Sequence, residues 1–177
     1  NMSNNSCRFD SNDKDAEAAE KKVAEYFGKW YNVTSVRDVT EYQEMDIDLI
    51  LTDKKTGEQT TLEVKSDKTY QYGNFAMEHV SNDLKGTEGC FLKTEADVIA
   101  IYYPLVNKLY LLDGPKTVKW FRENQHRFPE RKNGTKKMYG TGELYHSYFR
   151  LVNRQMFAKE TDAVIAIIDL NNLAQAS

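Results

Sequence analysis

The chain has 177 residues, of which 40% are hydrophobic and 29% are charged, and its net charge at pH 7 is −3. This composition predicts one soluble globular domain with a hydrophobic core. It excludes a transmembrane helix, because no apolar run reaches the roughly 20 residues that span a bilayer. The two cysteines, Cys7 and Cys90, are too few for a disulfide framework or a zinc site, so we expect free thiols and a cytoplasmic protein.

The first half of the chain predicts a tail, a helix and three strands. Residues 1–12 are polar, lack the apolar core of a secretory signal and predict a flexible tail. A helix is expected from about Asp13 to Lys29, with Ser11 or Asn12 as its N-cap and Gly28 near its end. The expected strands are Val33–Val39, Leu49–Thr52 and Thr60–Val64.

The second half predicts further strands around one helix and one long loop. Asn74–Asn82 fits a helix or an extended segment. A helix is expected at Lys116–Gln125, with Pro115 in its first turn. Arg127–Gly142 is expected to be a loop, because Pro129 and three glycines interrupt any periodicity. The other expected strands are Ala96–Tyr103, Lys108–Leu112, Tyr145–Asn153 and Ala163–Leu170.

The stretch from Asp48 to Lys65 places ionisable side chains inside strands that otherwise predict burial. A hairpin turn centred on Lys55 and Thr56 would set Asp48 opposite Glu63, although a bulge at Gly57 would shift this register. Opposed side chains have Cβ atoms about 5 Å apart, so the two carboxylates would repel unless a cation lay between them. Lys65 would share the face of Glu63, and Val64 would point the other way. The pattern therefore suggests a divalent cation and phosphodiester chemistry.

Asp48 with Glu63-Val64-Lys65 resembles the signature of the PD-(D/E)XK nuclease superfamily, which includes restriction endonucleases, Holliday-junction resolvases and phage nucleases. The resemblance covers roughly residues 13–112. It implies an α/β fold with a restriction-endonuclease-like α-β-β-β-α-β core, in which helices flank a mixed central sheet. Ile47 stands where the family has a proline, and Asp46 is an alternative to Asp48 as the metal ligand.

The resemblance also implies roles for these residues. Asp48, Glu63 and the backbone carbonyl of Val64 would hold Mg²⁺ or Mn²⁺. Lys65 would orient the attacking water or stabilise the pentavalent phosphate.

Two more acids enter by resemblance. Glu20 is the best match to a glutamate on the first helix that faces the active site in this superfamily, because Val23, Ala24 and Phe27 follow it on one helical face. The segment from Gly73 to Glu78 resembles one that follows the lysine in phage-type members, so Glu78 is a further candidate metal ligand. The alternative for Glu78 is an exposed helix face.

The charge of the chain is unevenly distributed. Lys116–Arg154 contains ten Lys and Arg against three Asp and Glu, a net +7, and the remainder carries −10. This asymmetry is typical of a surface that faces phosphates, and a solvated basic surface is the alternative. The expected nucleic-acid contacts, on a mobile loop around Gly134, are Arg131, Lys132, Lys136 and Lys137.

We therefore expect a metal-dependent deoxyribonuclease acting on double-stranded DNA, an endonuclease of the phage, mobile-element, restriction or repair type. Many members of the superfamily act as dimers, so a homodimer is a further expectation. The domain organisation is a tail at 1–12 and one nuclease-like domain at 13–177, with a core at 13–112 and a basic elaboration at 113–177. The alternatives are a catalytically inactive nuclease-fold subunit that binds nucleic acid or serves a structural role, and a metal-independent interaction domain.

Overall fold

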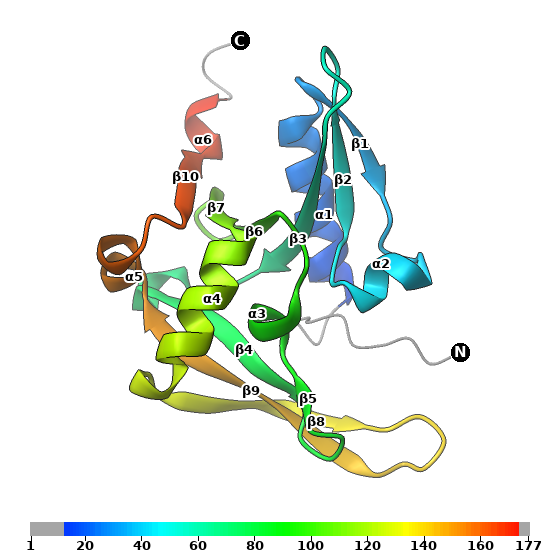
Figure 1. Cartoon of the computed structure of the whole chain (residues 1–177), viewed down its shortest axis with the longest axis vertical. Coiled ribbons are helices and arrows are strands. Elements are labelled where there is room, and N and C mark those ends of the chain that lie inside the picture. The colour runs from blue at the N-terminus through cyan, green and yellow to red at the C-terminus, as the bar shows by residue number, and fades with distance from the viewer. Residues whose placement is uncertain (1–12, 174–177) are drawn as a thin grey trace.

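The computed structural model describes residues 13–173, which form two β-sheets with helices packed against them (Figure 1). The described residues do not include the expected tail at 1–12. Cys7 and the two candidate N-caps of the first helix, Ser11 and Asn12, lie in that segment. In chain order the elements are α1 (Asp13–Phe27), β1 (Tyr31–Ser35), α2 (Thr40–Glu44), β2 (Leu49–Asp53), β3 (Gln59–Ser66), η1 (Tyr70–Tyr72), β4 (Asn74–Asn82), β5 (Thr87–Glu88), α3 (Cys90–Lys93), β6 (Val98–Tyr103), β7 (Lys108–Asp113), α4 (Gly114–Asn124), η2 (Gln125–Arg127), β8 (Glu130–Lys137), β9 (Leu144–Asn153), α5 (Arg154–Glu160), β10 (Val164–Asp169) and α6 (Leu170–Leu173).

The larger sheet has six strands in the order β1-β2-β3-β6-β7-β10. It is mixed, because β3 and β6 run parallel while its other neighbouring strands are antiparallel. Helix α1 packs on one face, where Ala19 and Val23 join Leu62 and Val64 in a buried cluster. The expected mixed sheet flanked by helices is confirmed, and the expected α-β-β-β-α-β order corresponds to α1, β1, β2, β3, α3 and β6.

The β2–β3 hairpin has the predicted register. Its ladder runs from Leu49 opposite Leu62 to Thr52 opposite Gln59, so no bulge at Gly57 shifts the pairing. Gly57 takes the left-handed conformation with φ 75°, which costs glycine little. The Asp53 carboxylate accepts the N–H groups of Lys55 and Thr56 at 2.7 and 2.8 Å. Local turn chemistry therefore sets which residues of β3 extend past β2.

The second sheet has four strands in the order β5-β4-β9-β8. Asn74–Asn82, which the sequence left open between helix and strand, is the strand β4. Its Phe75 and Met77 are buried in a core that also includes Phe91 of α3 and Phe121 of α4. The same core includes alternate residues of β6, such as Ile99 and Ile101, so it joins the second sheet to the first.

Two predicted elements are wrong in part. Half of the expected loop Arg127–Gly142 is strand β8, which pairs with β9 along Glu130–Lys137. Its polar side chains suit an exposed edge strand, and Gly134 sits in a bulge between Asn133 and Thr135 instead of ending the strand. The strand expected at Val33–Val39 ends at Ser35.

The helices were compared with what a membrane-spanning segment requires. No helix within residues 13–173 combines the length and apolar character that crossing a membrane requires.

Gly114 at the start of α4 leaves no space for a side chain. A Cβ added there would lie 2.0 Å from the carbonyl oxygen of Ala96, at the approach to β6. We expect Gly114→Ala to lower the free energy of unfolding by about 1–3 kcal/mol, because the backbone must shift to relieve the clash. Urea denaturation measures the change.

Gly134→Ala is the matched control, since a Cβ there meets nothing within 4 Å. It should change the free energy of unfolding by no more than about 0.5 kcal/mol. Equal stability of the two variants would contradict the close approach of α4 to the segment before β6.

Candidate active site and nucleic-acid interface

The candidate site lies where β2 begins and β3 continues past it. The last ladder pair is Leu49 with Leu62. Asp48 then donates its N–H to the Leu62 carbonyl at 2.8 Å, and its Oδ2 accepts the N–H of Val64 at 2.8 Å. A side chain therefore takes the place of the next backbone partner, and the Asp48 carboxylate lies against the backbone of β3.

This bond also orients the Val64 carbonyl. Along a strand, the N–H and C=O of one residue point to the same side. Because the Val64 N–H points to Asp48, its carbonyl oxygen points to the same edge. The Val64 side chain turns away, into the cluster that packs under α1. Asp48 and the Val64 carbonyl, two predicted metal ligands, thus lie on one edge of β3.

Glu63 and Lys65 form a buried ion pair on the opposite face of β3 from α1. The Lys65 Nζ lies 2.8 Å from Glu63 Oε1, and the side chains are 4% and 3% exposed. Burial, and then the negative charge of Asp48, raise the pKa of Glu63 well above its usual range, and Lys65 only partly opposes this. Asp48 is therefore close enough to act on Glu63, although it forms no ladder pair with it.

Asp46 is the second aspartate at the site. It takes the left-handed conformation with φ 53° after α2, a conformation that aspartate tolerates better than most residues. Its side chain is fully buried, and neither carboxylate oxygen has a hydrogen-bond partner among residues 13–173. Burial raises its pKa to about 6, while the ammonium groups of Lys93 and Lys65 act in the opposite direction.

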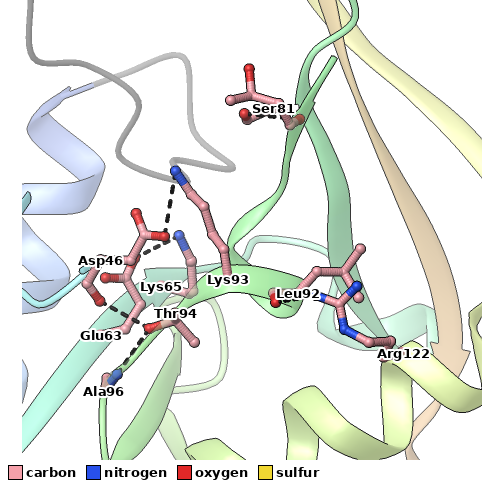
Figure 2. A network of polar contacts seen from close by, with 10 residues as sticks. Asp46, Glu63, Lys65, Ser81, Leu92, Lys93, Thr94, Ala96 and Arg122 are labelled. Atoms are coloured by element: carbon pink, nitrogen blue, oxygen red, sulfur yellow. Dashed lines mark hydrogen bonds and ion pairs between the residues drawn. The ribbon is translucent and has the colours of Figure 1, made fainter. Parts of the chain in front are cut away.

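Lys93 and Thr94 complete the site, and the sequence did not point to either. The Lys93 Nζ lies 3.7 Å from Asp46 Oδ2. Thr94 Oγ1 donates to the Asp46 carbonyl at 3.1 Å, and the Glu95 N–H donates to the Met45 carbonyl at 2.9 Å. Figure 2 shows the Lys93 and Lys65 ammonium groups pointing to the carboxylates of Asp46 and Glu63. The end of α3 therefore holds the turn that carries Asp46.

Glu20 lies on α1, which covers the other face of the sheet. It forms an ion pair with Arg37 at 3.6 Å, and both side chains are nearly buried. The helix packs through Ala19 and Val23 on the face opposite to the side chains of Glu63 and Lys65. Its predicted role beside the metal stays a prediction.

Glu78 lies in a strand and is 2% exposed, so the exposed-helix alternative is wrong. A Cβ added at Gly89 would lie 2.8 Å from Glu78 Cγ. Gly89 directly precedes α3, whose first residue, Cys90, is near enough to Glu63 to raise its pKa. Glu78 therefore lies close to the candidate site, on the second sheet.

The donor set fits a hard divalent cation. Oxygen atoms of Asp46, Asp48, Glu63 and the Val64 carbonyl are ligands that Mg²⁺ prefers. Three carboxylates face two lysines, which leaves a buried negative charge for a cation to balance. Within the described residues, no three Asp, Glu, His or Cys side chains form a preformed metal cluster. The Glu63 carboxylate is instead bound to Lys65.

The basic segment is partly neutralised within the fold. Four of its cations pair with carboxylates: Lys116 with Asp162, Arg122 with Glu88, Arg127 with Glu160 and Arg150 with Glu130. Arg154 instead lies over Tyr70 at 4.3 Å. Apart from Arg154, the cations of the segment without a carboxylate partner in residues 13–173 are Lys119, Arg131, Lys132, Lys136 and Lys137. All but Lys119 lie on β8, in the hairpin that extends beyond the rest of the second sheet (Figure 1).

The bulge at Gly134 sorts these four cations onto two faces. Arg131 pairs with Phe149 and Lys136 with Tyr145, two residues on the same face of β9. Lys132 pairs with Tyr148 and Lys137 with Leu144, which lie on the opposite face. Regular alternation without the bulge would have placed Lys136 with Lys132.

A cavity of about 330 Å³ identifies which face is turned to the candidate site. Arg131 and Phe149 line it together with Ser66, the residue after Lys65 at the end of β3. We call the face that carries Arg131 and Lys136 the inner face, and the face that carries Lys132 and Lys137 the outer face.

Comparisons with known proteins give one distant likeness. No protein-family model and no curated protein matches the chain. Among solved structures, it is similar to a bacterial homing endonuclease, I-Ssp6803I, with a TM-score of 0.43 and 14% sequence identity. The match covers 62% of this chain and 74% of the homing endonuclease chain.

Asp46 should make the metal-free protein less stable as the pH rises. Its folded-state pKa of about 6 exceeds the ordinary value of 3.8, so the folded chain binds the proton more tightly. Protonated Asp46 therefore stabilises the folded chain, and this contribution is fully present below about pH 4 and is lost as the pH rises through about 6. Relative to Asp46→Asn, the wild type should lose about 2–3 kcal/mol of unfolding free energy between about pH 4 and pH 7.5. Urea denaturation in EDTA measures the difference.

Asp162→Asn is the control, because its exposed carboxylate pairs with Lys116 and its pKa is lowered. Relative to Asp162→Asn, the wild type should lose no unfolding free energy as the pH rises over this range. A pH-independent difference between the wild type and Asp46→Asn would contradict the raised pKa of Asp46.

Proposed function

We propose that the protein is a Mg²⁺-dependent deoxyribonuclease, which also accepts Mn²⁺, and that it acts as an endonuclease on double-stranded DNA. The observation that carries this proposal is the buried cluster at the end of β2. There, Asp48 is fixed on the Val64 N–H beside the Glu63–Lys65 pair. An excess of buried carboxylates over ammonium groups is costly unless a cation compensates it.

Each residue has a part in the proposed reaction. Asp48 is the principal ligand, because one oxygen is held by the Val64 N–H while Oδ1 has no hydrogen-bond partner among the described residues. Glu63 and the Val64 carbonyl complete the protein ligands. When bound, Mg²⁺ would lower the pKa of a water molecule and neutralise charge on the phosphoryl oxygens.

The two lysines act on the phosphate. Lys65 is a buried cation beside the ligand Glu63, so we assign it to the negative charge that develops on the pentavalent phosphate. Lys93 is 28% exposed and reaches Asp46 from α3, which suits a second contact to the phosphate or the leaving oxygen. Asp46 holds Lys93 in place and remains the alternative ligand.

DNA is the proposed substrate because the cations without carboxylate partners concentrate on β8. A two-stranded ribbon such as β8–β9 has dimensions that the major groove admits. Cutting both strands of a duplex requires two sites, which a homodimer would supply.

The second candidate is a catalytically inactive subunit that keeps the fold and binds nucleic acid. The unpaired cations on β8 would serve it equally well. The presence of Asp48, Glu63 and Lys65 together favours the enzyme, because a binding module has no use for this buried charge.

Lys65→Ala should reduce the rate of plasmid cleavage in Mg²⁺ by about 100-fold or more, because it removes a cation from the transition state. Glu63→Ala should have at least as large an effect through loss of a metal ligand. EDTA should abolish cleavage, and Mn²⁺ should restore it. The assay follows conversion of supercoiled plasmid to nicked and linear forms.

Lys159→Ala, an exposed lysine on α5, is the matched control and should cleave like the wild type. Cleavage that survives both Lys65→Ala and Glu63→Ala would refute the proposed site. Binding of DNA without cleavage in either metal would favour the inactive subunit.

The two faces of β8 should differ in their effect on DNA binding. We expect Arg131→Ala/Lys136→Ala to weaken duplex binding at least about tenfold more than Lys132→Ala/Lys137→Ala, because only the first pair lies on the inner face. Both variants lose two positive charges, so net charge cannot explain a difference. Fluorescence anisotropy over a salt series should give a slope reduced by about 2 for the inner pair. Equal losses for the two variants would show that the hairpin contributes only its overall charge.

A further inference from the structure

The cavity at the end of β3 has its own chemistry. It has a volume of about 330 Å³ and lies between the segment after β3 and the inner face of the second sheet. From β3 it is lined by Ser66 and the three residues that follow, and from β4 by Asn74 and Ala76. From β8 and β9 it is lined by Arg131, Asn133, Phe149 and Leu151.

Two links place this cavity beside the candidate site, one along the chain of β3 and one through the packing of β4 against the residue before α3. Ser66 directly follows Lys65 on β3. On β4, Ala76 lies on the same face as Glu78, two residues further along. Glu78 lies against Gly89, which directly precedes α3, and Cys90 at the start of α3 is near enough to Glu63 to raise its pKa. A group held in the cavity would therefore lie near the phosphate position proposed at Lys65.

The lining combines three kinds of group that a nucleotide needs. Tyr72, Ala76 and Leu151 offer apolar and aromatic surface for the face of a base. The side-chain amide of Asn74 makes no hydrogen bond to the described residues, so its donors and acceptor are available for a base edge. Arg131 supplies a cation without a carboxylate partner for a phosphate.

We propose that this cavity holds one nucleotide of the DNA strand next to the cleaved phosphate, with its base removed from the helical stack. The volume is near the lower end of the roughly 300–1,000 Å³ of ligand pockets, which suits a single nucleotide and is too small for a base pair. The preferred substrate is then a duplex with an unpaired nucleotide, because an unpaired base costs least to unstack. The inference rests on the proposed nuclease function and adds its substrate class.

The experiment compares two duplexes that differ by one unpaired nucleotide, with initial cleavage rates measured in Mg²⁺. The wild type should cleave the duplex with the unpaired nucleotide at least roughly tenfold faster. Ala76→Leu, which narrows the cavity, should lose this preference. Ala158→Leu, which changes the same residue type in a second cavity of about 410 Å³, should keep it. If Ala76→Leu does not fold by circular dichroism, Asn133→Ala replaces it and should reduce the preference.

The outcomes separate the two proposals. Absence of cleavage of either duplex in Mg²⁺ or Mn²⁺ would refute the nuclease function itself. Metal-dependent cleavage at equal rates on both duplexes, or an unchanged preference in Ala76→Leu, would refute only the nucleotide pocket. A parallel arm adds free deoxyadenosine monophosphate. Binding of the free nucleotide without any preference for the unpaired duplex would overturn the proposal in favour of a free-nucleotide ligand.

Discussion

The bond from the Val64 N–H to Asp48 Oδ2 is the contact on which the site depends. It forms where β2 can no longer pair with β3, so the backbone of β3 finds its partner in a side chain. A buried N–H without a partner would cost about 1–3 kcal/mol. The same bond fixes one carboxylate, orients the neighbouring carbonyl and brings negative charge to Glu63. A requirement of the backbone thereby arranges the ionisable groups.

The consequence is a site whose charges are poorly balanced by the protein alone. Asp46 and Glu63 both have raised pKa values, and burial is the main cause for each. A cation bound at the proposed site would relieve the interactions that disfavour the charged form, which would link binding of the metal to release of protons. Raised pKa values of this kind cluster at functional sites, although buried ion pairs in structural roles also show them.

The sequence predicted what local rules determine. The turn at Lys55–Thr56 sets the pairing of β2 with β3, and alternation sets the faces of Glu63, Val64 and Lys65. The expected loop that became β8 shows the opposite case, because a polar strand is stabilised by its partner β9 and not by its own composition. Lys93 and Thr94 could not be predicted either. Their contacts to Asp46 join residues nearly fifty positions apart and depend on how α3 packs.

The bulge at Gly134 determines on which face of the second sheet Lys136 and Lys137 lie. If the residue at position 134 paired with β9 as an ordinary strand residue, Lys136 and Lys137 would exchange faces, while the composition and net charge of the hairpin stayed almost the same. Related chains with the same number of lysines could thus present opposite electrostatic faces to a ligand. For this hairpin, the presence of the bulge says more about the charge that each face presents than the number of basic residues does.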